Sequence, residues 1–268
     1  MEINSTVNAR NLVRLEAALL AHPVAQAYFQ GRLFDGYGQP LRELNIHHTE
    51  GPPLRLNAAT TGRLCMIPDG SLVTATRIDD RSEAPAGVDI HYSNIFIQNG
   101  QHNSVVMYRS QSGPAMWIDA LYIRNVMLAP QAPPRLTSVA FGLMAIAAYR
   151  LGFQHISLLA AGGGPLRETS EDDLIGYAVW PKLSFDAEVA SVELDRFPNP
   201  ALTGAATVQD VRKNAPGWWE EHGSGRTMLF QLAANSRSWS ILLNYLYTAW
   251  RMQHDHRQKT TASARNRL

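Results

Sequence analysis

Residues 120–160 decide the fold, and they read ALYIRNVMLAP (120–130), QAPPRLTSVAFGLMAIAAYR (131–150) and LGFQHISLLA (151–160). The start and the end of this stretch are apolar and β-rich, which predicts two strands. Between them, Pro133-Pro134 can precede a helix but not lie inside one, and Gly152 is a typical stop after a run of helix formers. Because a helical connection between strands makes a crossover, we expect residues 120–128 and 155–160 to be parallel neighbours joined by a helix within 137–151.

The sequence before this unit is typical of an antiparallel meander. Short apolar or partly alternating runs are separated by turn signals, of which Asn99-Gly100 is a tight-hairpin signal. The expected strands are residues 63–67, 71–78, 88–97, 104–110 and 116–128.

The two ends of the chain are expected to be mostly helical or irregular. Residues 6–33 predict one helix, or two helices with a break near Pro23, and residues 35–60 are turn-rich and predict mostly loop. Towards the other end we expect a short helix within 171–180, a final strand within 183–192, a short helix from Thr207 and an amphipathic helix over 237–252.

Composition excludes several classes of protein. The chain has 268 residues, of which 45% are hydrophobic and 18% charged, so it can bury a sizeable core. Its single cysteine, Cys65, excludes an internal disulfide and a cysteine-based zinc cluster. The formal net charge of +1 gives no pull toward nucleic acid. No apolar run reaches the roughly 18 residues that span a bilayer, and the first residues lack a secretory pattern, so we expect no membrane span and a cytoplasmic protein.

Other motifs are weak indicators of a site. His47-His48 and His254-Asp255-His256 are neighbours in sequence, which rarely make a metal shell alone, so no metal is expected. Gly162-Gly163-Gly164 lacks the Lys-Ser/Thr of a phosphate-binding Walker motif. Trp218-Trp219 is either core or a lid over an apolar ligand, with core favoured.

A specific resemblance emerges when the 120–160 stretch is combined with YAVWPKLSF at residues 177–185. Together they resemble the acetyl-CoA-binding half of the GNAT superfamily of N-acyltransferases, over about a quarter of the chain. In that family a central strand ends near a proline, a loop and helix hold the CoA pyrophosphate, and a terminal Tyr-x-x-Leu-Gly-Phe segment packs beside the cofactor.

The resemblance implies an α+β fold, with a GNAT-like mixed, mostly antiparallel sheet flanked by helices and with helical N- and C-terminal extensions. The implied organisation is a helical or loop extension over 1–60, an acyltransferase core over 61–192, a C-terminal helical extension over 193–252 and a basic flexible tail over 253–268.

The implied donor is an acyl thioester, either acetyl-CoA or a longer acyl-CoA. A helix N-terminus offers free backbone N–H groups and a positive dipole end to the pyrophosphate. Thr137 or Ser138 is expected to cap that helix. A backbone N–H near Met127 or Leu128 would polarise the thioester carbonyl. The expected donor-binding residues are Met127, Leu128, Arg135, Leu136, Thr137, Ser138, Val139 and Ala140.

The implied chemistry needs an acid and a base. Tyr177 is the candidate that protonates the departing thiolate, since a phenol is protonated at neutral pH. Asp119 and His155 are the candidate bases that take the proton of the attacking amine, and His91 is a third. Each of these residues also has an ordinary structural interpretation, as a packing or solvated group.

The acceptor is an amine, and the length of both extensions suggests a peptide or protein. Two departures from the family pattern leave other functions open: residues 131–138 contain no glycine, and Trp180 stands where the family often has tyrosine. The alternatives are a fatty-acyl transferase in peptide lipidation and a non-catalytic GNAT-fold binding module. The sequence leaves the acceptor, the acyl length and the oligomeric state undetermined.

Overall fold

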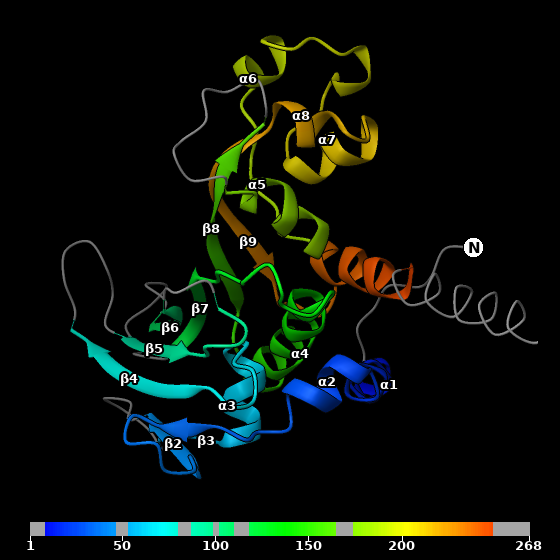
Figure 1. Cartoon of the computed structure of the whole chain (residues 1–268). Coiled ribbons are helices and arrows are strands. Elements are labelled where there is room, and N and C mark those ends of the chain that lie inside the picture. Colours follow the sequence, from blue (N-terminus) through cyan, green and yellow to red (C-terminus); the bar gives the residue numbers. More distant parts are fainter. Residues whose placement is uncertain are drawn as a thin grey trace, which may run out of the picture.

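The structure is a computed structural model, and it describes residues 9–46, 53–79, 87–98, 102–109, 118–164 and 174–248. Its centre is a seven-stranded mixed sheet in the order β1-β4-β5-β6-β7-β8-β9 (Figure 1). The pairs β1–β4 and β7–β8 are parallel and the other neighbouring pairs are antiparallel. The strands are β1 (Phe34–Asp35), β4 (Leu72–Ile78), β5 (Gly87–Ser93), β6 (Asn103–Arg109), β7 (Ile118–Asn125), β8 (His155–Gly163) and β9 (Ser224–Gln231). The fold is therefore α+β with a mostly antiparallel sheet flanked by helices.

The crossover predicted from residues 120–160 is confirmed. β7 and β8 run parallel from Ala120↔His155 to Ile123↔Leu158, and helix α4 (Leu136–Arg150) joins them. Gly152 follows α4 with a φ of +82°, a left-handed conformation that glycine adopts without steric cost. The local rules for proline and glycine thus decide where this unit changes from strand to helix and back.

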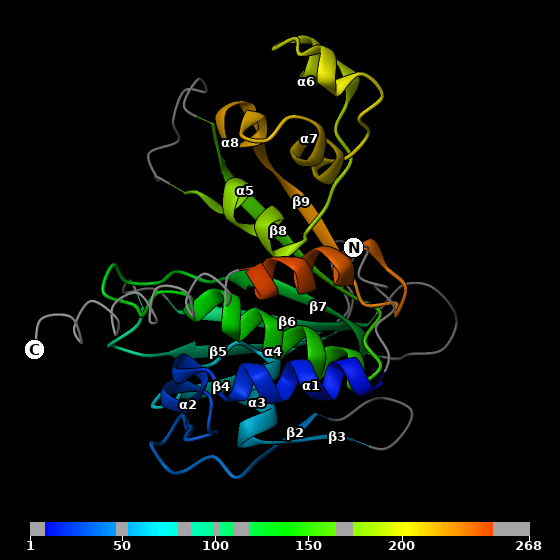
Figure 2. The ribbon, with the colours of Figure 1, turned by 90° about the vertical axis from the view of Figure 1, so that its right-hand side faces the viewer.

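The long helices among the described residues lie on one face of the main sheet. Figure 2 shows α1 (Ala9–Leu20), α4 and the helix at 237–248 stacked in front of the strands. Pro23 is the first residue of α2 (Pro23–Tyr28), where its missing N–H costs nothing, so the predicted break in the first helical region is confirmed. The helix α3 (Ala58–Leu64) packs against α4. Fully buried aromatic residues fill the space between helices and sheet, namely Phe29, Phe141, Phe185, Phe230 and Trp239.

A second, smaller layer is built on the ends of β8 and β9, which extend beyond their neighbours (Figure 1). It consists of short elements that the chain forms between these two strands. They are α5 (Gly176–Val179), η1 (Trp180–Leu183), α6 (Ser191–Asp195), η2 (Pro200–Leu202), α7 (Val208–Asn214) and α8 (Trp218–His222). The predicted helix start at Thr207 is confirmed, because its side chain accepts a hydrogen bond from the Asp210 N–H and caps α7.

Several local predictions differ from the structure. Residues 35–60 contain a hairpin of β2 (Glu43–Ile46) and β3 (Leu54–Asn57) rather than only loop. Part of the strand predicted at 63–67 is the end of α3, which Asn57 caps by accepting the Thr60 N–H. The strand predicted at 183–192 is instead a 3-10 turn, two isolated bridges and the start of α6. Asn99-Gly100 lies outside the described residues.

The region after residue 193 contributes a strand that the sequence reading did not include. β9 pairs with β8 from His155↔Gln231 to Ala160↔Arg226 and buries Met228 and Phe230, and the ring of Phe230 packs edge-on against Phe141 of α4. Its burial alternates along the strand, with Met228 and Phe230 inside and Leu229 39% exposed, but the run Met228-Leu229-Phe230 is apolar throughout and gave no alternating signal in the sequence. The C-terminal extension is thus part of the main sheet.

Candidate functional site

The parallel pairing of β7 and β8 stops in the middle of the sheet. Their last paired residues are Ile123 and Leu158. Beyond that point β7 continues to Asn125 beside β6, and β8 continues to Gly163 beside β9. Figure 1 shows β8 rising away from β7 above this point. The two strands therefore part, and the backbone edges that face each other there are no longer joined by ladder hydrogen bonds.

The chain that leaves β7 is anchored on the side away from β8. The Met127 N–H donates to Asn103 Oδ1 at 2.7 Å, and the Ala129 N–H donates to the carbonyl of Ile97 at 2.7 Å. Successive N–H groups of an extended chain point to opposite sides, so the Leu128 N–H faces the β8 side. Of the two N–H groups expected near the thioester, that of Met127 is already bonded, and that of Leu128 faces the place where the strands part.

The loop that leaves β7 leads to the N-terminus of α4 at Leu136. Its N-cap is Arg135 in a left-handed conformation (φ +69°), and the side chain of this N-cap residue makes no capping hydrogen bond. Thr137 and Ser138 lie inside the helix, so the predicted cap by either residue is wrong. The Leu136 N–H donates to the carbonyl of Pro133 at 3.2 Å. By position in the helix, the N–H groups of Thr137 and Ser138 have no intrahelical acceptor.

The side chains around this helix start have structural roles. Leu136, Val139 and Ala140 are buried in the core. The Ser138 hydroxyl lies 3.2 Å from the Tyr245 hydroxyl on the helix at 237–248. A ligand at this end of α4 would thus meet backbone N–H groups rather than most of these side chains.

Tyr177 lies on α5, which packs against the far end of β8. A Cβ atom built on Gly162 would lie 3.2 Å from Tyr177 Cδ1 and 1.6 Å from the carbonyl oxygen of Leu174, so only glycine fits there. The buried Tyr177 phenol donates to the carbonyl oxygen of Glu220 at 2.8 Å. Burial, with the nearby Glu220 carboxylate as a second cause, raises the pKa of Tyr177. The phenol is therefore protonated at neutral pH, and its proton is held in a hydrogen bond between α5 and α8.

The structure places the two predicted bases at the opposite end of the strands. His155 is the first residue of β8 and pairs with Ala120, next to Asp119 in β7. The side chain of Asp119 lies outside the described part of the structure. Seven residues separate His155 from Gly162 along β8, which corresponds to about 23 Å. His155 and Tyr177 are thus not brought together, whereas the start of α4 and the parting of β7 from β8 are at the same end.

The third candidate base, His91, is held by an aspartate that the sequence reading did not consider. His91 Nε2 lies 3.3 Å from Oδ2 of Asp89, and the guanidinium of Arg124 contacts the same oxygen. Asp89 lies in the middle of β5 and is only 3% exposed, which is unusual for a charged side chain. An acid between apolar residues of a strand was the available signal, but whether it is buried depends on the neighbouring strands.

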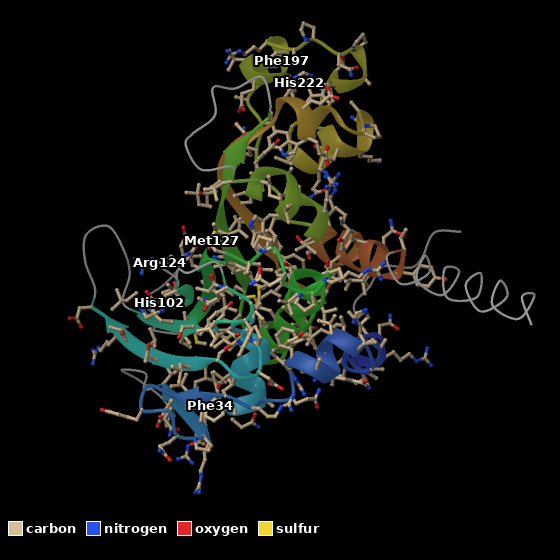
Figure 3. All side chains as sticks on the ribbon, in the orientation of Figure 1. Phe34, His102, Arg124, Met127, Phe197 and His222 are labelled. Carbon is tan, nitrogen blue, oxygen red and sulfur yellow. The ribbon has the colours of Figure 1, made fainter. Side chains whose placement is uncertain are left out.

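The glycine and tryptophan motifs have packing explanations. A Cβ atom on Gly164 would lie 2.0 Å from the carbonyl oxygen of Glu221, so Gly162 and Gly164 let α5 and α8 approach β8. Trp219 is fully buried and donates its indole N–H to the carbonyl of Tyr177 at 2.9 Å. Trp218 lines an open cleft of about 520 Å³, whose walls include the stacked rings of Phe197 and His222 (Figure 3).

Within the described part of the chain, no three or more His, Cys, Asp and Glu side chains are grouped so as to hold a metal ion. His47-His48 and residues 254–256 lie outside that part. Among the helices described, none is both long and apolar enough to cross a membrane. Neither protein-family models nor curated proteins gave a match to this chain.

Proposed function

We propose that this chain is a GNAT-like N-acyltransferase that moves an acyl group from acyl-CoA, or another acyl thioester, to an amine. One observation carries the proposal: β7 and β8 part after Ile123↔Leu158, at the same end as the N-terminus of α4. The proposal takes the start of α4 as the anion site, and it takes the neighbouring edges of β7 and β8, which no ladder hydrogen bond joins beyond Leu158, as the place of the thioester. The order of these elements is the one that the resemblance of residues 120–185 implies.

The donor's phosphates would bind at the start of α4. The Thr137 and Ser138 N–H groups and the positive end of the helix dipole suit an anion. α4 has 15 residues, so its dipole is fully developed. Arg135, at the N-cap, adds a positive charge next to this place. The loop has no glycine, so the left-handed Arg135 takes the backbone conformation for which glycine is the usual residue.

The pantetheine and the thioester would extend from there between β7 and β8. The Leu128 N–H, which faces that side, is the candidate donor to the carbonyl oxygen. The amine nitrogen attacks the carbonyl carbon, a C–N bond forms, and the C–S bond breaks. The nitrogen loses a proton to a base and the thiolate gains one, so the products are an amide and a free thiol. Tyr177 is the proposed acid, and it must give up its hydrogen bond to Glu220 to act.

A longer acyl chain is the second candidate for the donor, and an exposed apolar pair favours it. Ile95 and Phe96 are 85% and 76% exposed, in the turn that follows β5. A bridge between Gln98 and Leu128 holds this turn against the loop leaving β7. The Met127 N–H and the Tyr177 hydroxyl already donate hydrogen bonds within the protein, so neither is available for catalysis as the structure stands. This favours the other alternative, a binding module without catalysis.

Thermal unfolding with free CoA, acetyl-CoA and a long-chain acyl-CoA tests the proposal. A ligand that binds only the folded state at 100 times its Kd adds about 2.7 kcal/mol of stability. We expect at least one of the thioesters to raise the Tm by several degrees and to release free thiol when an amine is added. A rise in Tm without thiol release would indicate the binding module. No rise with any of the three compounds would refute a CoA site.

A further inference from the structure

The turn that follows β5 holds two large apolar side chains in water. Ile95 and Phe96, the apolar pair, are neighbours in sequence and are 85% and 76% exposed. The next residue, Ile97, is only 2% exposed and belongs to the core. Single exposed apolar residues are common on protein surfaces, whereas grouped ones usually mark a place of contact. The apolar pair therefore indicates a binding surface at this turn.

Two buried polar side chains fix the conformation of this turn. Asn94 is 4% exposed and Gln98 is 8% exposed. Asn94 Oδ1 accepts the N–H of Phe96 at 3.1 Å, and Asn94 Nδ2 donates to the carbonyl of Asp69 at 3.1 Å. Gln98 Oε1 accepts the Asn94 N–H, and Gln98 Nε2 donates to the carbonyl of Tyr92 at 3.0 Å. Because the turn is already ordered, a ligand that binds the apolar pair does not meet the entropy cost of ordering a loop.

The turn is bonded directly to the segment that leaves β7. A bridge joins Gln98 to Leu128, and the Ala129 N–H donates to the carbonyl of Ile97 at 2.7 Å. Residues 126–128 of that segment, Val-Met-Leu, are apolar and half-buried. The apolar pair and this apolar segment thus belong to one hydrogen-bonded unit, and the Leu128 N–H of the same unit is the proposed partner of the thioester carbonyl.

An acyl chain on the proposed thioester can reach the apolar pair. Bridged residues such as Gln98 and Leu128 lie about 5 Å apart, and Phe96 is two residues from Gln98, so the backbone of Phe96 lies within about 13 Å of that of Leu128. An acetyl group ends one carbon beyond the carbonyl and stops short of the pair. Since a C–C bond is about 1.5 Å long, an extended chain of roughly ten carbons spans the distance.

We propose that Ile95 and Phe96 bind the acyl chain of the donor and select its length, so that the donor is an acyl thioester of about ten carbons or more rather than acetyl-CoA. This inference rests on the proposed acyl transfer and names the class of its donor. The chain starts at the Leu128 N–H, crosses residues 126–128 and packs its outer methylenes on the apolar pair. The polar side chains of the turn are engaged in its own hydrogen bonds, so the surface selects for apolar length.

The burial of methylene groups gives this selection a characteristic dependence on chain length. Hydrophobic stabilisation is proportional to the apolar area that leaves water, and each fully buried methylene strengthens binding by up to about fourfold. Acyl groups too short to reach the apolar pair should therefore bind with similar affinity, and affinity should rise with each carbon once the chain reaches it. Replacing both side chains by serine removes most of the apolar area and should flatten this rise.

The test measures the affinity of acetyl-CoA, octanoyl-CoA and dodecanoyl-CoA by calorimetry. We expect the wild type to bind dodecanoyl-CoA at least about 30-fold more tightly than acetyl-CoA. The double variant Ile95→Ser/Phe96→Ser should bind dodecanoyl-CoA at least about tenfold more weakly than the wild type and acetyl-CoA equally well, and it should fold, because both positions are exposed. The control is Tyr37→Ser/Val192→Ser, which changes an aromatic and an aliphatic side chain that are 93% and 71% exposed elsewhere, and it should bind all three as the wild type does.

The outcomes separate this inference from the proposed function. If the wild type binds acyl-CoA and releases thiol with n-butylamine, but its affinity is independent of chain length, the acyl transfer stands and this inference is refuted. An equal rise with length in wild type and double variant places the chain elsewhere. If the wild type dimerises in sedimentation or binds phosphatidylcholine vesicles, and the double variant does neither while keeping its chain-length dependence, the apolar pair serves that contact and this inference is wrong. If no acyl-CoA binds the wild type, both proposals are refuted.

Discussion

Replacing Tyr177 by phenylalanine removes one hydroxyl group whose structural and catalytic roles can be measured separately. The hydroxyl donates to the carbonyl oxygen of Glu220 at 2.8 Å in a buried position, and so connects α5 to α8. The second connection, from the Trp219 indole N–H to the carbonyl of Tyr177, is independent of the hydroxyl. Packing should therefore survive, and the variant should fold.

The expected loss of stability follows from the Glu220 carbonyl oxygen, which the phenylalanine variant leaves without its donor. A typical hydrogen bond contributes about 0.5–1.5 kcal/mol, and a buried acceptor without its donor costs about 1–3 kcal/mol. We expect Tyr177→Phe to lower the free energy of unfolding by about 1–2 kcal/mol. For a chain of this size that corresponds to a Tm lower by roughly 2–6 °C. Tyr37→Phe is the control, because Tyr37 is 93% exposed and should change stability by less than about 0.5 kcal/mol.

The pH dependence of stability has a definite sign at this residue. The folded-state pKa of Tyr177 is raised above the unfolded value of 10.0 by burial and then by Glu220. A raised pKa means that the folded state holds its proton more tightly, so this contribution is complete below pH 10 and is lost as the pH rises above it. The wild type should therefore lose more stability than Tyr177→Phe between neutral pH and the alkaline range, as urea unfolding at several pH values will show.

The catalytic role predicts a separate effect. If Tyr177 protonates the thiolate, turnover should fall about 10–100-fold while donor affinity changes little, because the interaction strengthens only as the thiolate forms. Thiol release would be followed against pH for both proteins. Lower stability with equal turnover would refute the catalytic role and leave Tyr177 as a packing residue, the acid then being water or another side chain. Unchanged stability would refute the hydrogen bond to Glu220.

Three further changes test other parts of the structure. Gly162→Ala should lower the free energy of unfolding by about 2–4 kcal/mol in urea, because the alanine Cβ would lie 1.6 Å from the Leu174 carbonyl oxygen and the backbone φ is +97°. Near-wild-type stability would mean that α5 does not pack there. Ser138→Asp should weaken donor binding more than tenfold in calorimetry, since a carboxylate would face the phosphates, whereas Ser138→Ala should bind normally; equal affinity would exclude the helix start as the phosphate site. Burial alone would raise the pKa of Glu193, but the hydrogen bond and the charge of Arg226 lower this pKa below 4.5. The ion pair therefore stabilises the wild type above pH 4.5 and is lost as the pH falls further, so Glu193→Gln should be less stable above pH 4.5 and less sensitive to acid. A variant with an unchanged acid transition would contradict this ion pair.

The sequence by itself determined the elements whose limits depend on local chemistry. Pro23 begins α2, Thr207 caps α7, and Gly152 ends α4 with a positive φ, all for reasons of dihedral angles and unpaired N–H groups that act within a few residues. The crossover from β7 through α4 to β8 follows from the same signals, because strand, prolines, helix formers and glycine occur in an order that allows few topologies.

Tertiary structure decided the rest, because the deciding contacts join residues far apart in the chain. β9 completes the sheet beside β8 although about 70 residues separate them, and its position closes the core over Phe230. Residues 63–67 look like a strand, but Asn57 and packing against α4 place Leu64 in a helix.

The candidate site depended on register in the same way. The sequence analysis put forward Asp119 and His155 as the bases and His91 as a third candidate, from residue type and expected strand position alone. The pairing of β5 with β6 and of β6 with β7 brings His91 level with the point where β7 leaves β8, while His155 lies at the other end of its strand. The order and the register of the strands depend on which side chains each face of the sheet buries, and those side chains come together only in the folded chain.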